Sequence, residues 1–516
     1  MKYLLKISFV LTIIVSFYYF STTTGDYRPT NLVKIEYQKT EPGPDLLPYE
    51  WAYLQRVYPY MESDPNAYKE AIDQAHRLQR ETKINRMAKN QRTAQWEFAG
   101  PINVGGRVVD LEINPVSSNI IYAAFATGGV FKSTDMGGSW FSIFDSLNVL
   151  TIGDIAIDPV DTDIIYVGTG EANGGHNNFP GGGVYKSTNA GSTWNFLGLT
   201  NTTSIGRIII HPTNTDVIYL AAVGSYFAPN PERGIYKSTD GGNSWNQSLF
   251  ISDSTGGIDI VMDPNNPEFL FAAMWERVRR PNSSHLNGPS SGVHRSTNGG
   301  DSWELLGPST GLPNSSTQNV GRIGLAMSQS NSNITYALYT NGSIISGLYK
   351  TTDFGDSWVD VDSDGELGGG VGGFSWYFGQ VRVSPTNPDM VYVLDQGFMR
   401  STNGGDSWNV SFQTHVDHHA LTFHPNDSNW IIEGNDGGIN ISTNAGVSWG
   451  SHAFIPATQF YEIGLDANNP DKLYGGTQDN GTNRTPDGGL DNWQHIYGGD
   501  GFYVIVDHTN PNIIFC

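Results

Sequence analysis

The apolar positions of this chain form short runs that repeat in one order from about residue 95 onward. Each repeat opens with an apolar run ending in a turn, as in Ile157-Asp-Pro159 and Ile210-His-Pro212. A second run with an aromatic residue follows, such as Ile165-Tyr166, and a variable loop leads to a third, such as Val184-Tyr-Lys. Short apolar runs bounded by turn residues are typical of strands. With a fourth short run, the pattern predicts repeating units of four antiparallel strands.

The third and fourth strands of each unit are joined by one recurring turn, Ser/Thr-x-Asp/Asn-x-Gly-x-x-Trp. Its third position is occupied by Asp135, Asn189, Asp240, Asn298, Asp353, Asn403, Asn444 and, in a copy with one extra residue, Asp487. Because Asn replaces Asp in half of the copies, the turn requires an acceptor oxygen rather than a charge. Gly supplies a positive φ, and Trp supplies an apolar body with an N–H donor. These eight residues are therefore predicted to be structural.

Copies of the turn lie roughly 40 to 60 residues apart, a period typical of propeller blades. Four short antiparallel strands per repeat favour the same all-β architecture. We expect a β-propeller of about eight blades and the start of a ninth, as one large ring or as part of two rings. Trp96–Pro101 is similar to the fourth strand Trp303–Pro308, so it is expected to complete a blade formed by later strands. Phe502–Phe515 offers two strands and no third, so the sequence is expected to stop short of its natural end.

This turn is the Asp-box, or BNR repeat, and residues 95–516 resemble the propellers that carry it. Sialidases, xyloglucan-cleaving glycoside hydrolases and sortilin-type proteins are the families concerned. The segments YVGTGEAN, GNDGGI and GGTQDNGT also resemble secreted bacterial Asp-box propellers. The resemblance implies the fold, whereas activity has to be argued from a site. Arg107, Arg207 and Arg322 each follow a Gly, but the Arg-Ile/Leu-Pro segment typical of sialidases is missing.

The N-terminal region precedes the repeats and has a different composition. Residues 1–25 are predicted to be a signal peptide, with Lys2 and Lys6 before the apolar run Leu4–Phe20. An uncleaved membrane anchor is the alternative, and both place the remainder outside the cytoplasm, secreted or at the cell surface. Residues 26–94 are predicted to form an extended and helical arm, with helices at Tyr49–Tyr60 and Asn66–Met87. This arm is either a packing element or a lid over one propeller face.

The charge balance narrows the class of partner. The chain carries 51 Asp and Glu against 29 Lys and Arg, a formal net charge of −22. This balance disfavours nucleic acid, whose phosphates require a basic surface, and fits neutral or cationic ligands better. Cys516 is the single cysteine of the sequence, so no internal disulfide is expected.

Residues that one repeat carries alone are the candidates for function. They fall in the segments leading into each first strand and in the loops after each second strand, opposite the Asp-box turns. The expected ligand-binding residues are Glu171, His176, Arg277, Trp376, Tyr377, Asp417, His419 and Asn480. We expect them to bind an extracellular glycan or an extended peptide.

Carboxylates in the same loops allow a second interpretation. Asp436, Asp479 and Asp500 are candidates for the acid and base of glycosidic bond hydrolysis, although Asp-Gly and Asp-Asn-Gly also occur as plain turns. The alternative function is therefore a glycoside hydrolase acting on a neutral polysaccharide. The xyloglucan-cleaving family, which the chain resembles, uses two Asp residues in a cleft between two propellers. Carboxylates roughly 5 to 10 Å apart in a groove would favour hydrolysis, and scattered ones around a narrow channel would favour binding.

Two acidic segments raise the question of metal binding. His415, Asp417 and His419 alternate along a predicted strand and so share a face, as ligands of a transition metal or as hydrogen-bonded wall residues. Asp360, Asp362 and Asp364 have the opening spacing of a calcium loop, but Val371 stands where the loop requires Glu. An acidic surface turn is the favoured interpretation, and calcium binding is the alternative. No other cofactor is expected.

Overall fold

The computed structural model describes residues 97–175, 178–280, 283–369, 373–450 and 455–516, with helical residues at 67, 70–75, 77–78 and 80–81. The predicted signal peptide and His176 lie outside these residues. The described helical residues fall within the helix expected over Asn66–Met87, and the helix expected over Tyr49–Tyr60 lies outside the described residues. Among the described helices, none is both long and apolar enough to cross a membrane.

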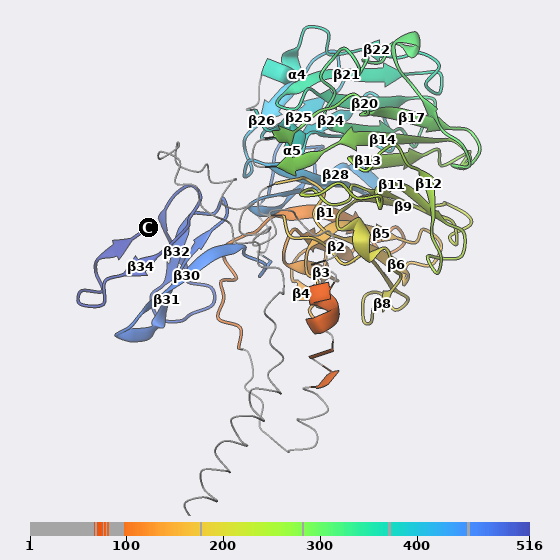
Figure 1. The fold of residues 1–516 in the computed structure, drawn as a ribbon. Helices are drawn as coiled ribbons and strands as arrows, with labels where there is room; N and C mark the ends of the chain where they lie inside the picture. Colours follow the sequence, from red (N-terminus) through yellow and green to blue (C-terminus); the bar gives the residue numbers. More distant parts are fainter. Residues whose placement is uncertain are drawn as a thin grey trace, which may run out of the picture. The chain divides into compact units, whose positions relative to one another are not determined.

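The repeats fold into successive antiparallel sheets, which we number as blades in chain order (Figure 1). Blade one comprises β1 (Val108–Ile113), β2 (Ile121–Phe125), β3 (Gly129–Ser133) and β4 (Phe141–Ser142). Blade two comprises β5 (Ile152–Ile157), β6 (Ile165–Thr169), β7 (Val184–Ser187) and β8 (Asn195–Phe196). Blade three comprises β9 (Ile205–Ile210), β10 (Ile218–Ala222), β11 (Gly234–Ser238) and β12 (Asn246–Leu249), after the short helix η1 (Thr200–Thr202).

Blade four contains β13 (Thr255–Met262), β14 (Leu270–Glu276), β17 (Gly292–Ser296) and β18 (Glu304–Leu305), with the inserted hairpin β15 (Val278–Arg280) and β16 (Ser283–His285). Blade five follows η2 (Pro308–Thr310) and contains β19 (Ile323–Met327), β20 (Thr335–Thr340), β21 (Ile345–Thr351) and β22 (Val359–Asp360). Helices α4 (Glu366–Gly369) and α5 (Ser375–Phe378) precede blade six, which contains β23 (Gln380–Val383), β24 (Val391–Leu394), β25 (Phe398–Ser401) and β26 (Asn409–Ser411).

Blade seven contains β27 (His418–His424), β28 (Asp427–Asn435) and β29 (Gly438–Ser442), with an isolated bridge between Ile441 and Gly450. An eighth sheet contains β30 (Phe460–Asp466), β31 (Asn469–Thr477), β32 (Thr482–Thr485) and β33 (Gln494–Tyr497). The two-stranded sheet of β34 (Ile505–Val506) and β35 (Ile514–Phe515) comes last. The all-β propeller prediction is confirmed.

The ring closes at seven blades. Seven hydrophobic clusters among the described residues together span every pair of adjacent blades from one to seven and the pair of blades seven and one. One of them packs Val108 and Leu111 of β1 against Ala420 of β27 and Ile432 of β28, and Figure 1 shows β1 beside β28. Since blade one contacts blade seven directly, the eighth sheet is not part of this ring. The alternative of one large ring with eight or more blades is therefore wrong.

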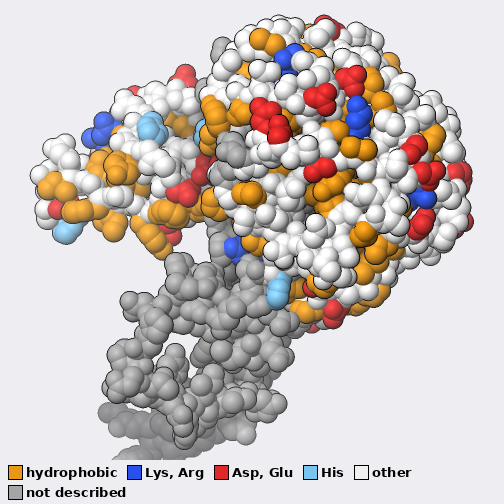
Figure 2. Space-filling view, turned by 90° about the horizontal axis from the view of Figure 1, so that it is seen from above, with side chains coloured by type: hydrophobic (Ala, Val, Ile, Leu, Met, Phe, Trp, Pro, Cys, Tyr) orange, Lys and Arg blue, Asp and Glu red, His pale blue; other side chains and the backbone are white. Residues whose placement is uncertain are grey.

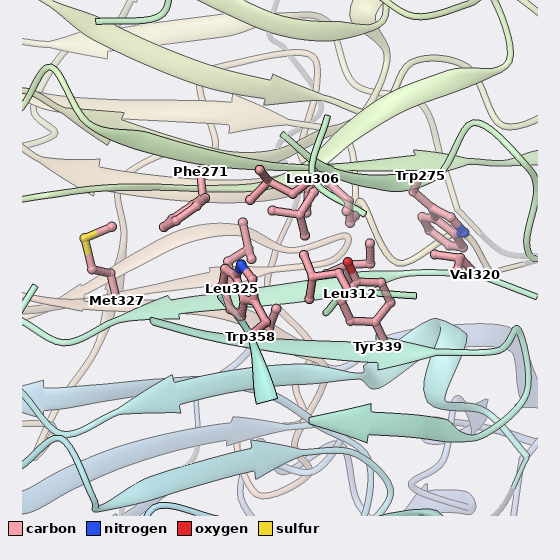
Figure 3. Packing of buried hydrophobic residues seen from close by; sticks show 14 of the residues in the cluster. Phe271, Trp275, Leu306, Leu312, Val320, Leu325, Met327, Tyr339 and Trp358 are labelled. Carbon is pink, nitrogen blue, oxygen red and sulfur yellow. The ribbon is translucent and has the colours of Figure 1, made fainter. Parts of the chain in front are cut away.

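The interface between blades four and five shows how the ring is packed (Figure 3). Phe271 and Trp275 of β14 point toward Leu325 and Tyr339 of blade five, and these four side chains are at most 2% exposed. Burying an aromatic or large aliphatic side chain contributes about 1.5–3 kcal/mol. Such contacts are repeated around the ring. They hold adjacent blades together, because the blades are otherwise joined only by the polypeptide chain that runs from one to the next.

The segment expected to complete a blade behaves differently. Its described part, Glu97–Pro101, forms no strand. Gly100 takes a φ of 81° and Pro101 has no N–H to donate, so a strand ladder cannot run through them. The chain instead runs beside the eighth sheet, where Ile102 N–H donates to the carbonyl of Leu490 at 2.8 Å. The predicted contact with a late part of the chain is present, but the predicted strand is wrong.

The Asp-box turns have the predicted structure. In the first copy, Asp135 Oδ1 accepts hydrogen bonds from Ser133 Oγ and from the backbone N–H of Ser139, both at 2.8 Å. In the second copy, Asn189 Oδ1 accepts the equivalent backbone bond from Thr193 at 2.8 Å. The Trp of that copy, Trp194, donates from Nε1 to the carbonyl of Ile143 in blade one at 2.8 Å. The turn therefore closes one blade and docks it on its neighbour.

One position of the turn is strained in some copies. The residue before the Gly also has a positive φ, and it is Met136, Ala190, Phe354 or Ala445 in four copies and Gly in others. A left-handed conformation costs an L-residue about 1–2 kcal/mol. We expect Ala190→Gly, at a φ of 53°, to raise the free energy of unfolding by about 1 kcal/mol in chemical denaturation. The reciprocal change Gly241→Ala, at the same turn position, should lower it by about the same amount; equal stabilities would contradict the argument.

Candidate functional site

The unique loop residues gather at the end of the ring opposite the Asp-box turns. Arg107 directly precedes β1, Glu171 and Asn173 follow β6, and Tyr377 lies in α5. His419 is the second residue of β27, and Asp436 lies between β28 and β29. We call these six residues the mouth cluster. Blades one, two, six and seven therefore supply one site, although its members are far apart in sequence.

Arg107 is the centre of the mouth cluster. Its Nε and Nη2 atoms donate to the two oxygens of Asp436 at 3.0 and 3.2 Å, and Nη1 donates to Glu171 Oε1 at 3.1 Å. The three side chains are 5%, 2% and 2% exposed. Burial lowers the pKa of Arg107, but Asp436, Tyr377 and Glu171 outweigh it and raise the pKa above its ordinary value. The guanidinium thus stays charged and neutralises carboxylates that water does not reach.

The neighbouring hydrogen bonds fix the protonation of His419. Arg322 can only donate, and its Nη1 lies 2.9 Å from Asn173 Oδ1, which leaves Asn173 Nδ2 facing His419 Nδ1 at 3.3 Å. His419 Nδ1 therefore accepts, and Nε2 donates to Asp436 Oδ1 at 2.8 Å. Burial, followed by the charge of Arg107, lowers the pKa of His419 well below its usual value. The imidazole is neutral, with its proton on Nε2.

Tyr377 completes the mouth cluster. Its hydroxyl donates to Glu171 Oε1 at 2.9 Å, and the Arg107 guanidinium lies 5.2 Å from its ring centroid. Its carbonyl accepts from Arg322 Nη1 at 2.6 Å. Each charged or polar group of the cluster is consequently held by another protein group. The cluster is a rigid floor rather than a set of free ligands.

A second set of carboxylates, Asp417, Asp479 and Asp500, lies beside this floor, and we call them the outer carboxylates. Oxygens of Asp417, Asp436 and Asp479 lie within 4.8 Å of one another. Gln478 Nε2 donates to Asp479 Oδ2 at 2.7 Å, and the Asp479 N–H donates to Asp500 Oδ1 at 3.0 Å. The Asp479 side chain is 29% exposed. Asp417 Oδ1 has no hydrogen-bond partner among the described residues.

The outer carboxylates differ from the floor in their titration. Burial, then the charges of Asp436 and Asp479, raises the pKa of Asp417 to about 7. Burial, then a hydrogen bond with Asp436, raises the pKa of Asp479 to about 6. Burial also raises the pKa of Asp500. The pKa values of Asp417 and Asp479 therefore lie close to neutral pH, whereas plain turn carboxylates are charged there.

Backbone strain marks the same residues. Asp417 has a φ of 71° and Asp479 a φ of 56°. Strained backbone in a folded protein is concentrated at functional sites, because the surrounding structure has to maintain it. The prediction that His415, Asp417 and His419 alternate along one strand is wrong. β27 begins at His418, so His415 and Asp417 precede the strand, and Asp417 has a positive φ.

The remaining sequence candidates lie around this site. Asn480 Nδ2 donates to the carbonyl of Asp436 at 2.8 Å. Arg277 is fully buried, donates to the carbonyl of Gly174 at 3.0 Å and lies 5.1 Å from the Trp376 ring, so it supports the loop that carries Glu171. The structure therefore brings together every described candidate except the calcium loop. The ligand-binding and catalytic roles of these residues stay predictions.

The carboxylates considered as metal ligands already interact with other groups of the protein. Asp417 and Asp479 are close enough to share a cation with Asp436, but Arg107 already lies 3.0 Å from Asp436 and 3.9 Å from Asp479. The guanidinium of Arg107 thus already supplies a positive charge beside two of these three carboxylates. Asp360 and Asp362 accept backbone N–H bonds from Asp362 and Leu367, both at 3.0 Å, which is the pattern of an acidic turn. Calcium binding at residues 360–364 stays a prediction.

Sequence reasoning did not select Arg107, Asn173, Gln478 or Arg322 for the site. A signal for two of them was present, since Arg107 and Arg322 follow a Gly at the start of blades one and five. Asn173 and Gln478 are neighbours of selected residues in the same loops. Their roles depend on contacts across the ring, which no local pattern shows.

Comparison with known proteins finds that the chain is similar to glycoside hydrolases. No protein-family model matches it. It is 23% identical over 348 residues to the xyloglucanase Xgh74A of Acetivibrio thermocellus, covering 59% of this chain and 38% of that protein. It is 22% identical over 343 residues to the xyloglucanase of Hypocrea jecorina, with the same coverage. The chain is an Asp-box β-propeller protein distantly related to xyloglucanases. It spans well under half the length of these relatives.

Solved structures agree on the fold. The Niastella koreensis GH74 enzyme superposes with a TM-score of 0.54 at 17% identity, covering 80% of this chain and 70% of that chain. An ancestral GH74 enzyme gives a TM-score of 0.56 at 20% identity, covering 80% and 58%. The resemblance to xyloglucan-cleaving propellers is confirmed. At this level of identity it establishes the architecture and leaves the activity to the site.

Proposed function

We propose that the protein binds a neutral polysaccharide chain at the ring mouth. The observation that carries this proposal is the division of its carboxylates: Glu171 and Asp436 are neutralised by Arg107, while Asp417, Asp479 and Asp500 remain as acceptors. Sugar hydroxyls donate to such acceptors, and hydrogen bonds to charged groups contribute about 1.5–3 kcal/mol each. The relationship to xyloglucanases supports a xyloglucan-like chain as the ligand. The N-terminal segment supports a secreted or cell-surface location.

The net charge of the protein and its exposed aromatic side chains support a neutral rather than an anionic ligand. The formal net charge is −22, and Figure 2 shows acidic side chains spread over one face with basic ones at few places. Exposed aromatic side chains lie in the segments that carry the site, including Phe374 before α5 and Phe502 after Asp500. Their apolar faces suit the C–H surface of a sugar ring, and their rigidity keeps the entropic cost of binding low.

The test is retention on polysaccharides in affinity electrophoresis. We expect wild-type protein to be retarded by xyloglucan and not by polygalacturonate, and Asp479→Asn to weaken retention about tenfold, the effect of losing one charged acceptor. Retention should also weaken from pH 8 to pH 5, because Asp417 and Asp479, with pKa values of about 7 and about 6, become protonated over this range.

A matched control is Asp471→Asn, which removes an exposed carboxylate within β31 of the same sheet. It should leave retention unchanged. Wild-type protein that no neutral polysaccharide retards, or an Asp479→Asn variant that binds like wild type, would overturn the proposal.

One observation favours hydrolysis as a second candidate. Asp417 and Asp479 form a carboxylate pair with oxygens within 4.8 Å and pKa values of about 7 and about 6. One group could donate a proton to the leaving oxygen while the other acts as nucleophile. Their separation is nearer the ~5 Å of retaining glycosidases than the ~6.5–9.5 Å of inverting ones. Release of reducing ends from xyloglucan, abolished by Asp479→Asn, would establish this reaction; retention without release would limit the site to binding.

A further inference from the structure

The ring channel holds a cavity of about 450 Å³ at its Asp-box end. The ends of the first strands line it, with Pro159, Pro212, Pro264 and Pro385 at the turns. Its volume is that of a small-molecule site. No residue of the mouth cluster and no outer carboxylate lines it, so the cavity is independent of the function proposed above.

A layer of charged residues forms the inner end of the cavity. Most of these residues make contacts that join adjacent blades of the ring. Asp110, Asp154 and Asp259 each accept the backbone N–H of the next first strand, from Ile155, Ile208 and Leu325 at 2.9, 2.7 and 3.0 Å. Arg207 pairs with Asp154 at 3.3 Å and with Asp259 at 3.1 Å. These contacts join adjacent blades, so the three Asp residues are engaged in structure.

Glu112 takes no part in these contacts between blades. It lies two residues after Asp110 on β1, therefore on the same face, and it lines the cavity. It has no hydrogen bond or ion pair with the described residues, although Arg207 and Arg382 face the same space. Arg382 donates instead to Gln380 Oε1 at 2.7 Å and to the carbonyl of Val381 at 2.9 Å.

The layer has an acidic excess by formal charge, and burial raises the pKa of Asp110 and of Asp154 as well as that of Glu112. Asp110, Glu112, Asp154 and Asp259 face Arg207 and Arg382, while Arg322 is directed to Asn173 and Tyr377. Burial, followed by the charge of Asp110, raises the pKa of Glu112 to about 8, although the charges of Arg207 and Arg382 act in the opposite direction. A cation brought beside Glu112 would offset this excess.

The walls of the cavity favour a ligand that has an apolar part. The positions equivalent to Glu112 in the next blades are Ala156, Ile209, Val261 and Ala326, and all four line the cavity. We propose that the cavity binds a primary amine with a compact apolar body, whose ammonium group pairs with Glu112 while the body contacts these side chains. The amine is either a small molecule or the side chain of a lysine.

Isothermal titration calorimetry at pH 8.5 tests the proposal, because Glu112 is then mostly ionised and an alkylamine is still charged. The probes are 2-phenylethylamine, its neutral isostere 2-phenylethanol, and Nα-acetyl-lysine amide. We expect wild-type protein to bind 2-phenylethylamine at least about tenfold more tightly than 2-phenylethanol, and Glu112→Gln to remove this preference. Binding of the lysine derivative at similar strength would indicate a peptide ligand; its failure would indicate a free amine.

The control variant is Glu268→Gln, which removes an exposed carboxylate from the turn after β13 at the same end of the ring. It should bind 2-phenylethylamine like wild type. Equal binding of the amine and the alcohol, absence of binding, or an undiminished preference in Glu112→Gln would each overturn the proposal. Polysaccharide retention by Glu112→Gln should equal that of wild type, so this outcome is separate from that of the mouth site.

Discussion

Replacement of Arg107 by Gln is expected to lower the free energy of unfolding by about 3–5 kcal/mol at pH 7, the cost of breaking a buried ion pair from one side. Arg107 makes four hydrogen bonds to Asp436 and Glu171 at 3.0–3.4 Å, and both carboxylates are 2% exposed. Without the guanidinium they would be left charged with few donors and no access to water. Urea denaturation of the two proteins measures the difference.

The neutralised triple variant provides the decisive comparison. Adding Glu171→Gln and Asp436→Asn to Arg107→Gln removes the stranded charges, so most of the lost stability should return. Arg295→Gln is the matched surface control, because its partners Glu304 and Asp356 are 66% and 75% exposed, and it should cost less than about 1 kcal/mol. A triple variant as unstable as Arg107→Gln would show that the charges are not the cause.

The blade could be predicted from sequence because its determinants are local. The acceptor oxygen of Asp135 and the Ser139 N–H that it binds are four residues apart. The same turn recurs with Asn189 and Thr193 in place of Asp and Ser. Interactions at such short separation form wherever their residues occur in order, so one motif identified each four-stranded unit.

Ring closure and the mouth cluster could not be predicted, because they depend on distant residues. Arg107 and Asp436 are 329 positions apart, and Arg107 and Glu171 are 64 apart. Which blade meets blade one follows from the packing of Val108 against Ala420, not from any local signal. Repeat comparison still found Glu171, Asp436 and Asp479, since it selects residues that break the pattern. It missed Arg107 because a Gly-Arg pair also begins blades three and five.

Gly153→Ala is expected to lower the free energy of unfolding by about 3 kcal/mol or more, the upper range for overpacking a core. A Cβ at Gly153 would lie 1.9 Å from the carbonyl oxygen of Ile205 and 2.6 Å from that of Gly170. Both atoms belong to backbone that is fixed by neighbouring strands, so no side-chain rotation can relieve the contact. Gly206 has the same role one blade later, with a Cβ position 2.4 Å from the carbonyl oxygen of Ile258. Glycine at these positions lets the first strands approach closely enough to form the channel.

Thermal and urea denaturation of Gly153→Ala beside Gly307→Ala measure this effect. A Cβ at Gly307 would meet no atom within 4 Å, and its φ of −161° is accessible to any residue, so this variant should stay within about 0.5 kcal/mol of wild type. Because Gly153 lies in β5 between the mouth loops and the channel cavity, its substitution should also weaken polysaccharide retention and amine binding together. Loss of stability equal in the two variants would mean that backbone entropy, not the close approach of strands, explains the glycine. A stable Gly153→Ala protein would show that the ring can widen, and the spacing of the first strands would then not be what holds the seven blades in register.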